Sequence, residues 1–187
     1  MGARLSIAAT PLAGVVSVAT ARLQDERGSF ARLFCGDELG EVLQGRTIAQ
    51  VNQTRTRVVG TVRGLHFQRA PHAEMKFVRC VRGRVWDVAL DLRAGSPTFW
   101  HWHAQELSAD NALMLVLPEG CAHGFQCLEP DSELLYLHTA AFAPGAEGGV
   151  HCQEARAGIR WPLPVTGLSP RDASFPPLPP DFAGLDS

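Results

Sequence analysis

The sequence lacks the features that would place the protein in a membrane or on a nucleic acid. No run approaches the roughly 18 consecutive apolar residues that a membrane-spanning helix needs. The formal net charge is only -2, so no excess of basic residues favours nucleic acid or an anionic lipid surface. The five cysteines form no C-x-x-C pair, and their odd number excludes complete disulfide pairing within one chain. We therefore expect a cytoplasmic protein with reduced, mostly buried thiols.

Helical periodicity is also scarce. The best helix candidate is the short stretch "GDELGEVL", residues 36–43. The chain contains 18 glycines and 13 prolines, which favours a turn-rich, strand-rich fold over a helix bundle. Seven of the prolines follow position 161, so we expect an irregular tail from about residue 162. No repeat or linker divides the chain, and its length predicts a single domain over residues 1–187.

What the sequence does contain is a series of short runs in which apolar residues alternate with others. In the clearest run Trp86, Val88, Leu90 and Leu92 are spaced by two. The run before it ends at "RGR", residues 82–84, which predicts a tight hairpin turn between two strands. Similar runs cover residues 13–22, 47–54, 100–108, 112–120 and 122–142. Short strands at this spacing predict a β-sandwich or barrel, for which a double-sheet jelly roll is one solution.

Two stretches carry residues suited to chemistry. "VRGLHFQ", residues 62–68, places His66 in a strand-like run, three residues after Arg63. Successive side chains of a strand point to opposite faces, so His66 and Phe67 diverge. We expect Arg63 to lie where the strand begins. The second stretch is "LPEGCAHGF", residues 117–125, which contains His123.

The second stretch resembles the second conserved motif of the cupin superfamily. That resemblance implies an all-β, cupin-type jelly-roll barrel with a few short helices, whose inward strand faces line one cavity. It also implies that the His66 face of its strand forms part of the cavity wall. Metal-binding cupins would use ligands such as His66, His72, Glu74 and His123. They typically place two histidines one residue apart in the first motif, whereas here that position reads His-Phe-Gln. His72 is six residues beyond His66, past an expected loop, so a metal site is the less favoured alternative.

A longer resemblance runs from about Asp25 to Asp172, where the chain is similar to the dTDP-4-dehydrorhamnose 3,5-epimerase family. The matching strings are "RGSF", "QVNQT", "VRGLHFQ", "MKFVRCVRGRVWDVALDLRAGSPTF", "LPEGCAHGF", "LLYLHT", "WP" and "LSPRDA". The resemblance implies inversion of carbon 3, carbon 5 or both in a nucleotide-linked 4-keto-6-deoxy sugar, in deoxysugar or rhamnose biosynthesis. It implies no metal or redox cofactor. Its implied partners are the nucleotide-diphosphate sugar and a second copy in a homodimer, with no nucleic acid or membrane.

The same resemblance assigns the catalytic residues. His66 matches the general base, a task suited to a side chain with an ordinary pKa of about 6.5. Asp172 matches the carboxylate that orients this histidine, and Lys76 matches the cation beside the developing enolate oxygen. Tyr136, which is the only tyrosine of the chain, matches the acid on the opposite face of the sugar. Without the resemblance each has an ordinary structural explanation, as a core histidine, a turn aspartate, a strand-edge lysine and an amphipathic strand tyrosine.

Six further residues match substrate-binding positions: Arg27, Phe30, Gln50, Asn52, Arg63 and His123. The two arginines match diphosphate contacts, for which guanidinium groups are suited. Phe30 matches a residue that stacks on the base, Gln50 and Asn52 match polar contacts, and His123 matches a sugar-pocket histidine. In this family the N-terminal segment reaches the partner's site, which implies that Arg27 and Phe30 act across a dimer.

Two positions depart from the family pattern. Arg32 stands where a glutamate is usual, which leaves the identity of the nucleotide base open, and Phe142 stands where a second tyrosine is common. The pattern also leaves alternatives open: an epimerase of one carbon only, a 3,4-ketoisomerase of a related nucleotide sugar, or a sugar-binding cupin without catalysis.

Overall fold

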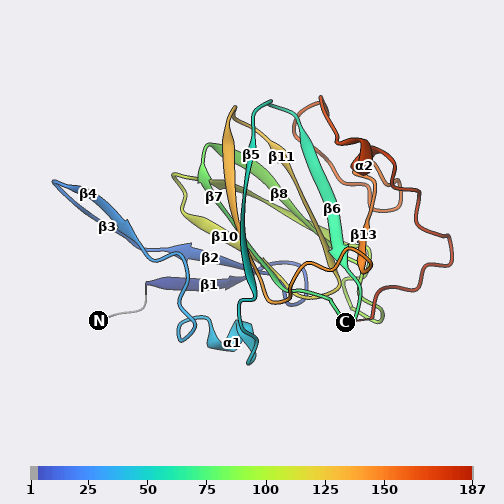
Figure 1. The fold of residues 1–187 in the computed structure, drawn as a ribbon, viewed down its shortest axis with the longest axis horizontal. Helices are drawn as coiled ribbons and strands as arrows, with labels where there is room; N and C mark the ends of the chain where they lie inside the picture. The colour runs from blue at the N-terminus through green and yellow to red at the C-terminus, as the bar shows by residue number, and fades with distance from the viewer. Residues whose placement is uncertain (1–3, 187) are drawn as a thin grey trace.

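The computed structural model describes residues 4–186 and consists of two antiparallel β-sheets packed face to face, with a two-stranded arm projecting from one side (Figure 1). The all-β prediction is confirmed. Helical structure in this range is limited to α1 (Gly40–Leu43) and α2 (Pro170–Ala173). None of its helices has the length and hydrophobicity needed to cross a membrane.

The first sheet has six strands in the order β1-β2-β10-β7-β12-β5. They are β1 (Leu5–Ala9), β2 (Val16–Thr20), β10 (Leu113–Leu117), β7 (Lys76–Arg82), β12 (Ser132–His138) and β5 (Gln50–Thr56). The second sheet has five strands in the order β13-β6-β11-β8-β9. They are β13 (Glu147–Gly149), β6 (Val62–Gln68), β11 (Cys121–Cys127), β8 (Arg84–Asp91) and β9 (Trp102–Ser108). The arm pairs β3 (Arg22–Asp25) with β4 (Gly28–Ala31).

The predicted hairpin at residues 82–84 is wrong. β7 pairs with β10 and β12, whereas β8 pairs with β11 and β9, so the chain changes sheets at Gly83. Gly83 has φ +70°, and a Cβ placed there would lie 2.4 Å from the Ser132 hydroxyl. A hairpin turn and a corner between sheets favour the same glycine, which is why the sequence pattern did not separate them.

Three clusters of buried apolar side chains hold the layers together. One lies between the sheets and includes Val78 and Leu115 from the first and Val85 and Phe125 from the second. A second covers the outer face of the six-stranded sheet with residues 34–48, and a third covers the outer face of the five-stranded sheet with residues 150–185. Because both faces of the central strands are covered, β11 is buried along its whole length.

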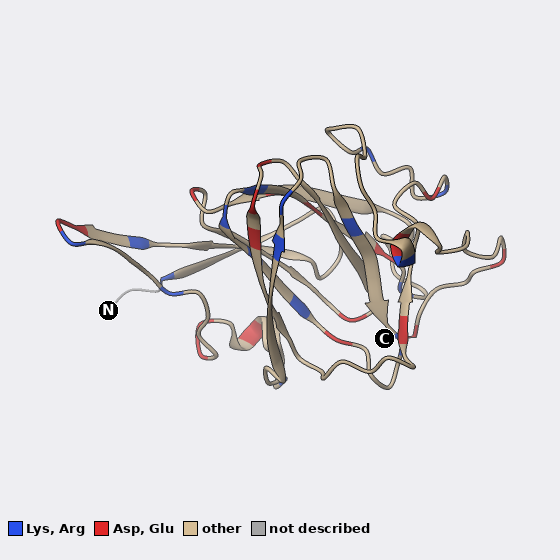
Figure 2. Cartoon of the chain, turned by 45° about the horizontal axis from the view of Figure 1, so that its top comes forward, with Lys and Arg blue, Asp and Glu red and all other residues tan. Residues whose placement is uncertain are grey.

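The predicted helix over 36–43 is helical only in its last turn, and residues 36–39 form a turn instead. Gly36 and Gly40 disfavour helix, while Leu39 and Leu43 are spaced to anchor one turn in the core. The tail from residue 162 is mostly irregular, as predicted, and includes α2. Four of the five cysteines are buried, and Cys35 is half-buried. Basic and acidic residues are interspersed along the ribbon (Figure 2).

Candidate active site

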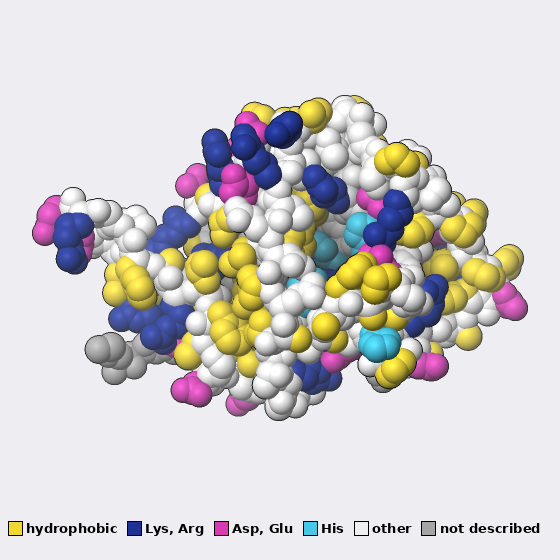
Figure 3. Space-filling view, in the orientation of Figure 1, with side chains coloured by type: hydrophobic (Ala, Val, Ile, Leu, Met, Phe, Trp, Pro, Cys, Tyr) yellow, Lys and Arg dark blue, Asp and Glu magenta, His cyan; other side chains and the backbone are white. Residues whose placement is uncertain are grey.

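The two sheets separate at one end and leave a cavity of about 590 Å³ between them. The space-filling view shows this hollow, with histidine side chains inside it and basic side chains at its rim (Figure 3). Its walls come from β5, β7 and β12 on one side and from β6, β11 and the segment around α2 on the other. The expectation that the His66 face of β6 lines a cavity is met, since His66 is among the lining residues.

His66 reaches the cavity because β6 and β11 approach each other closely. His66 and His123 are direct partners across these strands, so both side chains share one face. Gly64 makes the close approach possible: its φ is +113°, and an added Cβ would lie 2.6 Å from the carbonyl oxygen of His123. Phe67, on the other face of β6, is buried in the cluster under residues 150–185.

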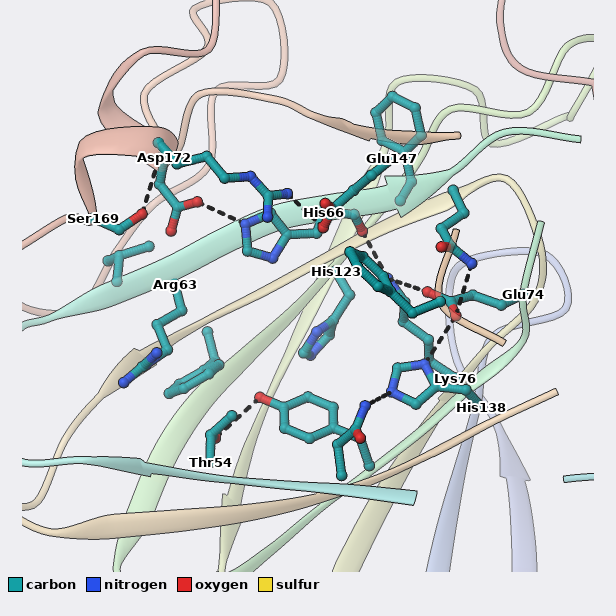
Figure 4. Close-up of a pocket in the computed structure, with 18 of the residues that line it drawn as sticks. Thr54, Arg63, His66, Glu74, Lys76, His123, His138, Glu147, Ser169 and Asp172 are labelled. Carbon is teal, nitrogen blue, oxygen red and sulfur yellow. Dashed lines mark hydrogen bonds and ion pairs between the residues drawn. The ribbon is translucent and has the colours of Figure 1, made fainter. Parts of the chain in front are cut away.

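Asp172 lies beside His66, the neighbour that the family resemblance implied (Figure 4). The Nε2 of His66 is 2.7 Å from Asp172 Oδ1, and the backbone N–H of Gly64 donates to Asp172 Oδ2 at 3.2 Å. Burial opposes the charge on Asp172, but the hydrogen bonds from His66 and Gly64 keep its pKa below the ordinary value. The carboxylate therefore stays ionised and accepts the Nε2 hydrogen, which leaves the lone pair on Nδ1 of the imidazole.

The opposite wall presents side chains in two rows across three adjacent strands. Tyr136 of β12 lies beside Asn52 of β5, and His138 lies beside Gln50 of β5 and Lys76 of β7. Because these residues are spaced by two along each strand, all of them face the cavity.

Tyr136 is largely buried in the wall of the cavity. Its ring is only 9% exposed and lies edge-on to the His123 ring, with the centroids 5.8 Å apart. Its hydroxyl is 3.5 Å from Thr54 Oγ1. Burial raises the pKa of the phenol well above its ordinary value, so Tyr136 keeps its proton and can act as a donor.

Lys76 of the six-stranded sheet forms a hydrogen bond to the five-stranded sheet inside the cavity. Its ammonium group donates to the backbone carbonyl of His66 at 2.9 Å and lies 3.2 Å from Glu74 Oε1. Burial lowers the pKa of Lys76, and the charge of Glu74 opposes that effect. The lysine thus places a cation deep in the cavity, next to the strand that carries His66.

His123 is held by a buried carboxylate of its own. Its Nε2 is 2.8 Å from Asp87 Oδ2, and the side chains are 7% and 0% exposed. Burial raises the pKa of Asp87, while His123 acts in the opposite direction. This contact fixes the imidazole of His123 in the cavity wall next to Tyr136.

The remaining binding residues divide into two groups. Gln50, Asn52 and Arg63 line the cavity, and Arg63 donates to Thr56 Oγ1 at 2.9 Å. Arg27 and Phe30 do not line the cavity of their own chain. They lie on the projecting arm, where Arg27 pairs with Asp25 and Phe30 is 60% exposed (Figure 1).

The two departures from the expected pattern have different surroundings. Arg32 forms an ion pair with Glu38, whose carboxylate also accepts from the backbone N–H groups of Arg4 and Leu5. Phe142 lines the cavity and is 54% exposed, and its backbone N–H donates to Gln50 Oε1 at 3.0 Å. Among residues 4–186, no group of three or more histidine, cysteine or acidic side chains is arranged to hold a metal, and His72 is exposed outside the cavity.

Some residues that line the cavity were given no role in the sequence analysis, namely His138, Glu147 and Arg171. Glu74 also lines it and was considered there only as a possible metal ligand. Arg171 and Glu147 form an ion pair of 2.5 Å at the cavity edge. For His138 a signal was present, because it follows Tyr136 by two residues on the same strand. Arg171 precedes Asp172 directly, but its place at the cavity depends on how the tail folds back over β6.

Comparison with known proteins extends the likeness over nearly the whole chain. The family model described as dTDP-4-dehydrorhamnose 3,5-epimerase matches residues 9–179. A dTDP-4-dehydrorhamnose 3,5-epimerase of Salmonella typhimurium is 42% identical over 157 residues, which are 82% of this chain and 85% of that protein. A dTDP-4-dehydrorhamnose 3-epimerase of Streptomyces niveus is 38% identical over 161 residues, which are 85% of this chain and 77% of that protein.

A solved structure agrees in fold. The dTDP-6-deoxy-D-glucose-3,5-epimerase of Legionella pneumophila, crystallised in complex with dTDP-4-keto-L-rhamnose, is 34% identical and superposes with a TM-score of 0.86. The match covers 91% of this chain and 91% of that chain. Together with the sheet topology, this likeness confirms the predicted jelly-roll class.

Proposed function

The chain belongs to the dTDP-4-dehydrorhamnose 3,5-epimerase family and is an isomerase of nucleotide-linked 4-keto-6-deoxy sugars; on that premise, we propose that His66, Asp172, Lys76 and Tyr136 carry out the epimerisation. The observation that carries the proposal is the pair formed by His66 and Asp172, which faces the cavity from one sheet while Tyr136 faces it from the other. A base and an acid on opposite walls are what an inversion at carbon requires.

Proton removal falls to His66. A carbon next to the ketone carries a weakly acidic hydrogen, and Nδ1 of His66 has the free lone pair to take it. The electrons of the C–H bond form a carbon–carbon double bond, and the carbonyl oxygen becomes an enolate. Asp172 stabilises the resulting imidazolium through Nε2.

The enolate oxygen needs a positive neighbour, and Lys76 is the buried cation of the cavity wall. Its charge is worth more there than in water because few solvent dipoles compete with it. Tyr136 then donates its hydroxyl proton to the opposite face of the carbon, and the double-bond electrons form the new C–H bond as the ketone returns. The tyrosinate and the imidazolium exchange protons with water, which restores the starting state.

The nucleotide end of the substrate is bound at the rim, where Arg63 lies. Arg27 and Phe30 are too far out on the arm to serve their own cavity, so we assign them to the cavity of a second copy in a homodimer. Leu23 and Phe30 of the arm are 50% and 60% exposed, and Ile7 on the edge strand β1 is 41% exposed. Such apolar side chains on an arm and an open sheet edge favour an exchange of arms between two copies.

The test is solvent exchange in heavy water. dTDP-4-keto-6-deoxyglucose incubated with the protein is expected to gain deuterium at carbon 3, carbon 5 or both, measured by proton NMR and mass spectrometry. A His66→Ala variant serves as the control and is expected to abolish the exchange. If no 4-keto nucleotide sugar gained deuterium with the unmodified protein, the proposed function would be wrong.

An epimerase of one carbon is the second candidate. It is favoured by the 38% identity to a protein named as a 3-epimerase and by the exposed ring of Phe142 at the cavity. Phe142 has no hydroxyl with which to hold the sugar in either of two orientations. The same experiment decides, because deuterium at carbon 3 alone would identify the narrower activity.

A further inference from the structure

The carboxylate of Glu74 is shared between two basic side chains inside the cavity (Figure 4). Glu74 Oε1 is 3.2 Å from the ammonium nitrogen of Lys76, and Glu74 Oε2 is 3.0 Å from Nδ1 of His138. The three side chains are nearly inaccessible, at 7%, 8% and 11% exposure. They form a compact buried group, here called the Lys76–Glu74–His138 triad.

The charge of this triad depends on one proton. Lys76 and Glu74 together are neutral, so the cation assigned to the enolate is cancelled by its own partner. A proton on His138 adds one positive charge and gives Glu74 a second cation to balance. We propose that His138 is a positioning residue whose protonation restores a net positive charge beside the enolate oxygen, so that the protonated form of the triad is the active one.

The surroundings of His138 can accept both charge states. Nδ1 donates to Glu74 in either state. Nε2 lies 3.4 Å from the side-chain amide of Asn52, which can donate to a neutral nitrogen or, after turning, accept from a protonated one. The ring stacks on Tyr136 with an interplanar angle of 19° and a centroid separation of 6.0 Å. A change of charge on His138 therefore requires no rearrangement of the strand.

The other charged groups around the triad do not replace this role. Glu147 from β13 lines the same cavity and adds negative charge near Lys76, but it is paired with Arg171. His66 and His123 face the cavity from β6 and β11, and each is held by a carboxylate of its own, Asp172 and Asp87. Tyr136 stays protonated because burial raises its pKa. Histidine is the type of side chain whose charge can change near neutral pH, and His138 is the histidine of the triad.

The consequence is a rate that depends on pH in two directions. His66 must be neutral to accept a proton from the sugar. The rate therefore rises with pH as the imidazolium form of His66 gives way to the neutral form. His138 must be protonated, so the rate falls again as His138 loses its proton at higher pH. The second limb is expected in kcat more than in KM, because the negative charge that it stabilises exists only after the C–H bond breaks.

Three variants test this, with deuterium exchange measured from pH 5.5 to 9.5. His138→Gln fixes the triad as neutral, so it should keep the rise that belongs to His66 but level off at the slow high-pH rate of the wild type, roughly tenfold below the maximum. Glu74→Gln leaves the charge of Lys76 unopposed, so as long as Lys76 keeps its proton the rate should no longer depend on the charge of His138. Because Glu74 also opposes the lowering of the Lys76 pKa by burial, any fall in rate that remains in this variant should belong to Lys76. The double variant should recover the rate that His138→Gln lost. A purely structural role for His138 predicts no such recovery. A descending limb that persists in His138→Gln, where Glu74 is intact, would belong to Lys76 and would contradict the proposal.

NMR titration of labelled histidine in the unmodified protein keeps the test decisive if a variant fails to fold. The His138 resonance is expected to shift over the pH range of the descending limb. A His138 that stays neutral across the active pH range, or a double variant no faster than His138→Gln, would overturn the inference. The inference rests on the proposed function, but different results contradict the two. If the wild type shows no exchange, the proposed function is wrong. If exchange occurs and the pH profile of His138→Gln is the same as that of the wild type, only the role of the triad is wrong.

Discussion

His66 and Asp172 lie 106 residues apart in the sequence, yet their side chains meet at 2.7 Å. The contact forms because the tail folds back over β6 and presents the short helix α2 to it. Ser169 caps that helix by accepting from the backbone N–H of Asp172 at 3.0 Å, which fixes where the carboxylate starts. The backbone N–H of Gly64 holds the second carboxylate oxygen, so the position of Asp172 is determined from both sides.

Asp172→Asn is expected to lower the rate of deuterium exchange by about 10²–10⁴-fold. The amide is nearly the same size, but it no longer selects the tautomer that leaves Nδ1 of His66 free, and it does not stabilise the imidazolium. Binding of dTDP, measured by calorimetry, should change little because Asp172 is assigned no contact with the nucleotide. Exchange at the wild-type rate in this variant would show that the carboxylate plays no part in the chemistry.

Tyr136→Phe should separate proton exchange from inversion. His66 can still remove the proton and return a deuteron to the same face, so substrate labelling should persist. Delivery to the opposite face should fall by about 10²-fold or more, because no other phenol exists in the chain. Chiral analysis of the labelled sugar by NMR measures both outcomes. Thr54→Val is the matched control, since it removes only the 3.5 Å contact to the Tyr136 hydroxyl. If Tyr136→Phe lost inversion and labelling in equal measure, the role of Tyr136 as the acid on the opposite face would be contradicted.

Many of the residues that line the cavity could be predicted because successive side chains of a strand point to opposite faces. Spacing by two places Gln50 and Asn52 on one face of β5, and from Tyr136 on β12 the same spacing could have carried the prediction to His138. The family resemblance supplied Asp172, whose contact with His66 depends on the path of an irregular tail. No periodicity describes such a tail, because its backbone hydrogen bonds follow no repeating ladder.

The strand pairing could not be read from the sequence in the same way. β7 and β8 are consecutive and joined by one glycine, yet they belong to different sheets. The pattern of apolar residues reports that a strand is buried on both faces, but not which strand lies beside it. The same limit applies to Asp87 of β8, which is fully buried and whose carboxylate contacts His123 on the adjacent strand β11, although its direct partner in the ladder is Phe125.

Gly83→Ala is expected to destabilise the fold more than Gly95→Ala, measured as the free energy of unfolding in denaturant. Both glycines have φ near +70°, at +70° and +71°, so both alanines carry the same backbone strain of about 1 kcal/mol. At Gly95 an added Cβ meets nothing within 4 Å, whereas at Gly83 it would lie 2.4 Å from Ser132 Oγ. The clash should cost a further 1–3 kcal/mol, roughly. Equal losses in the two variants would mean that Ser132 moves freely and that the corner is not tightly packed.

Mixing two inactive variants tests whether the arm serves the neighbouring copy. One variant carries Arg27→Ala and Phe30→Ala, and the other carries His66→Ala. If the arm acts across a dimer, a mixed dimer holds one cavity with both His66 and an intact arm. Random assortment of equal amounts after co-expression should then restore about a quarter of the wild-type sites, measured as deuterium exchange per chain. If each arm served its own cavity, every mixed dimer would still lack a complete site, and the mixture would be no more active than the average of its parents.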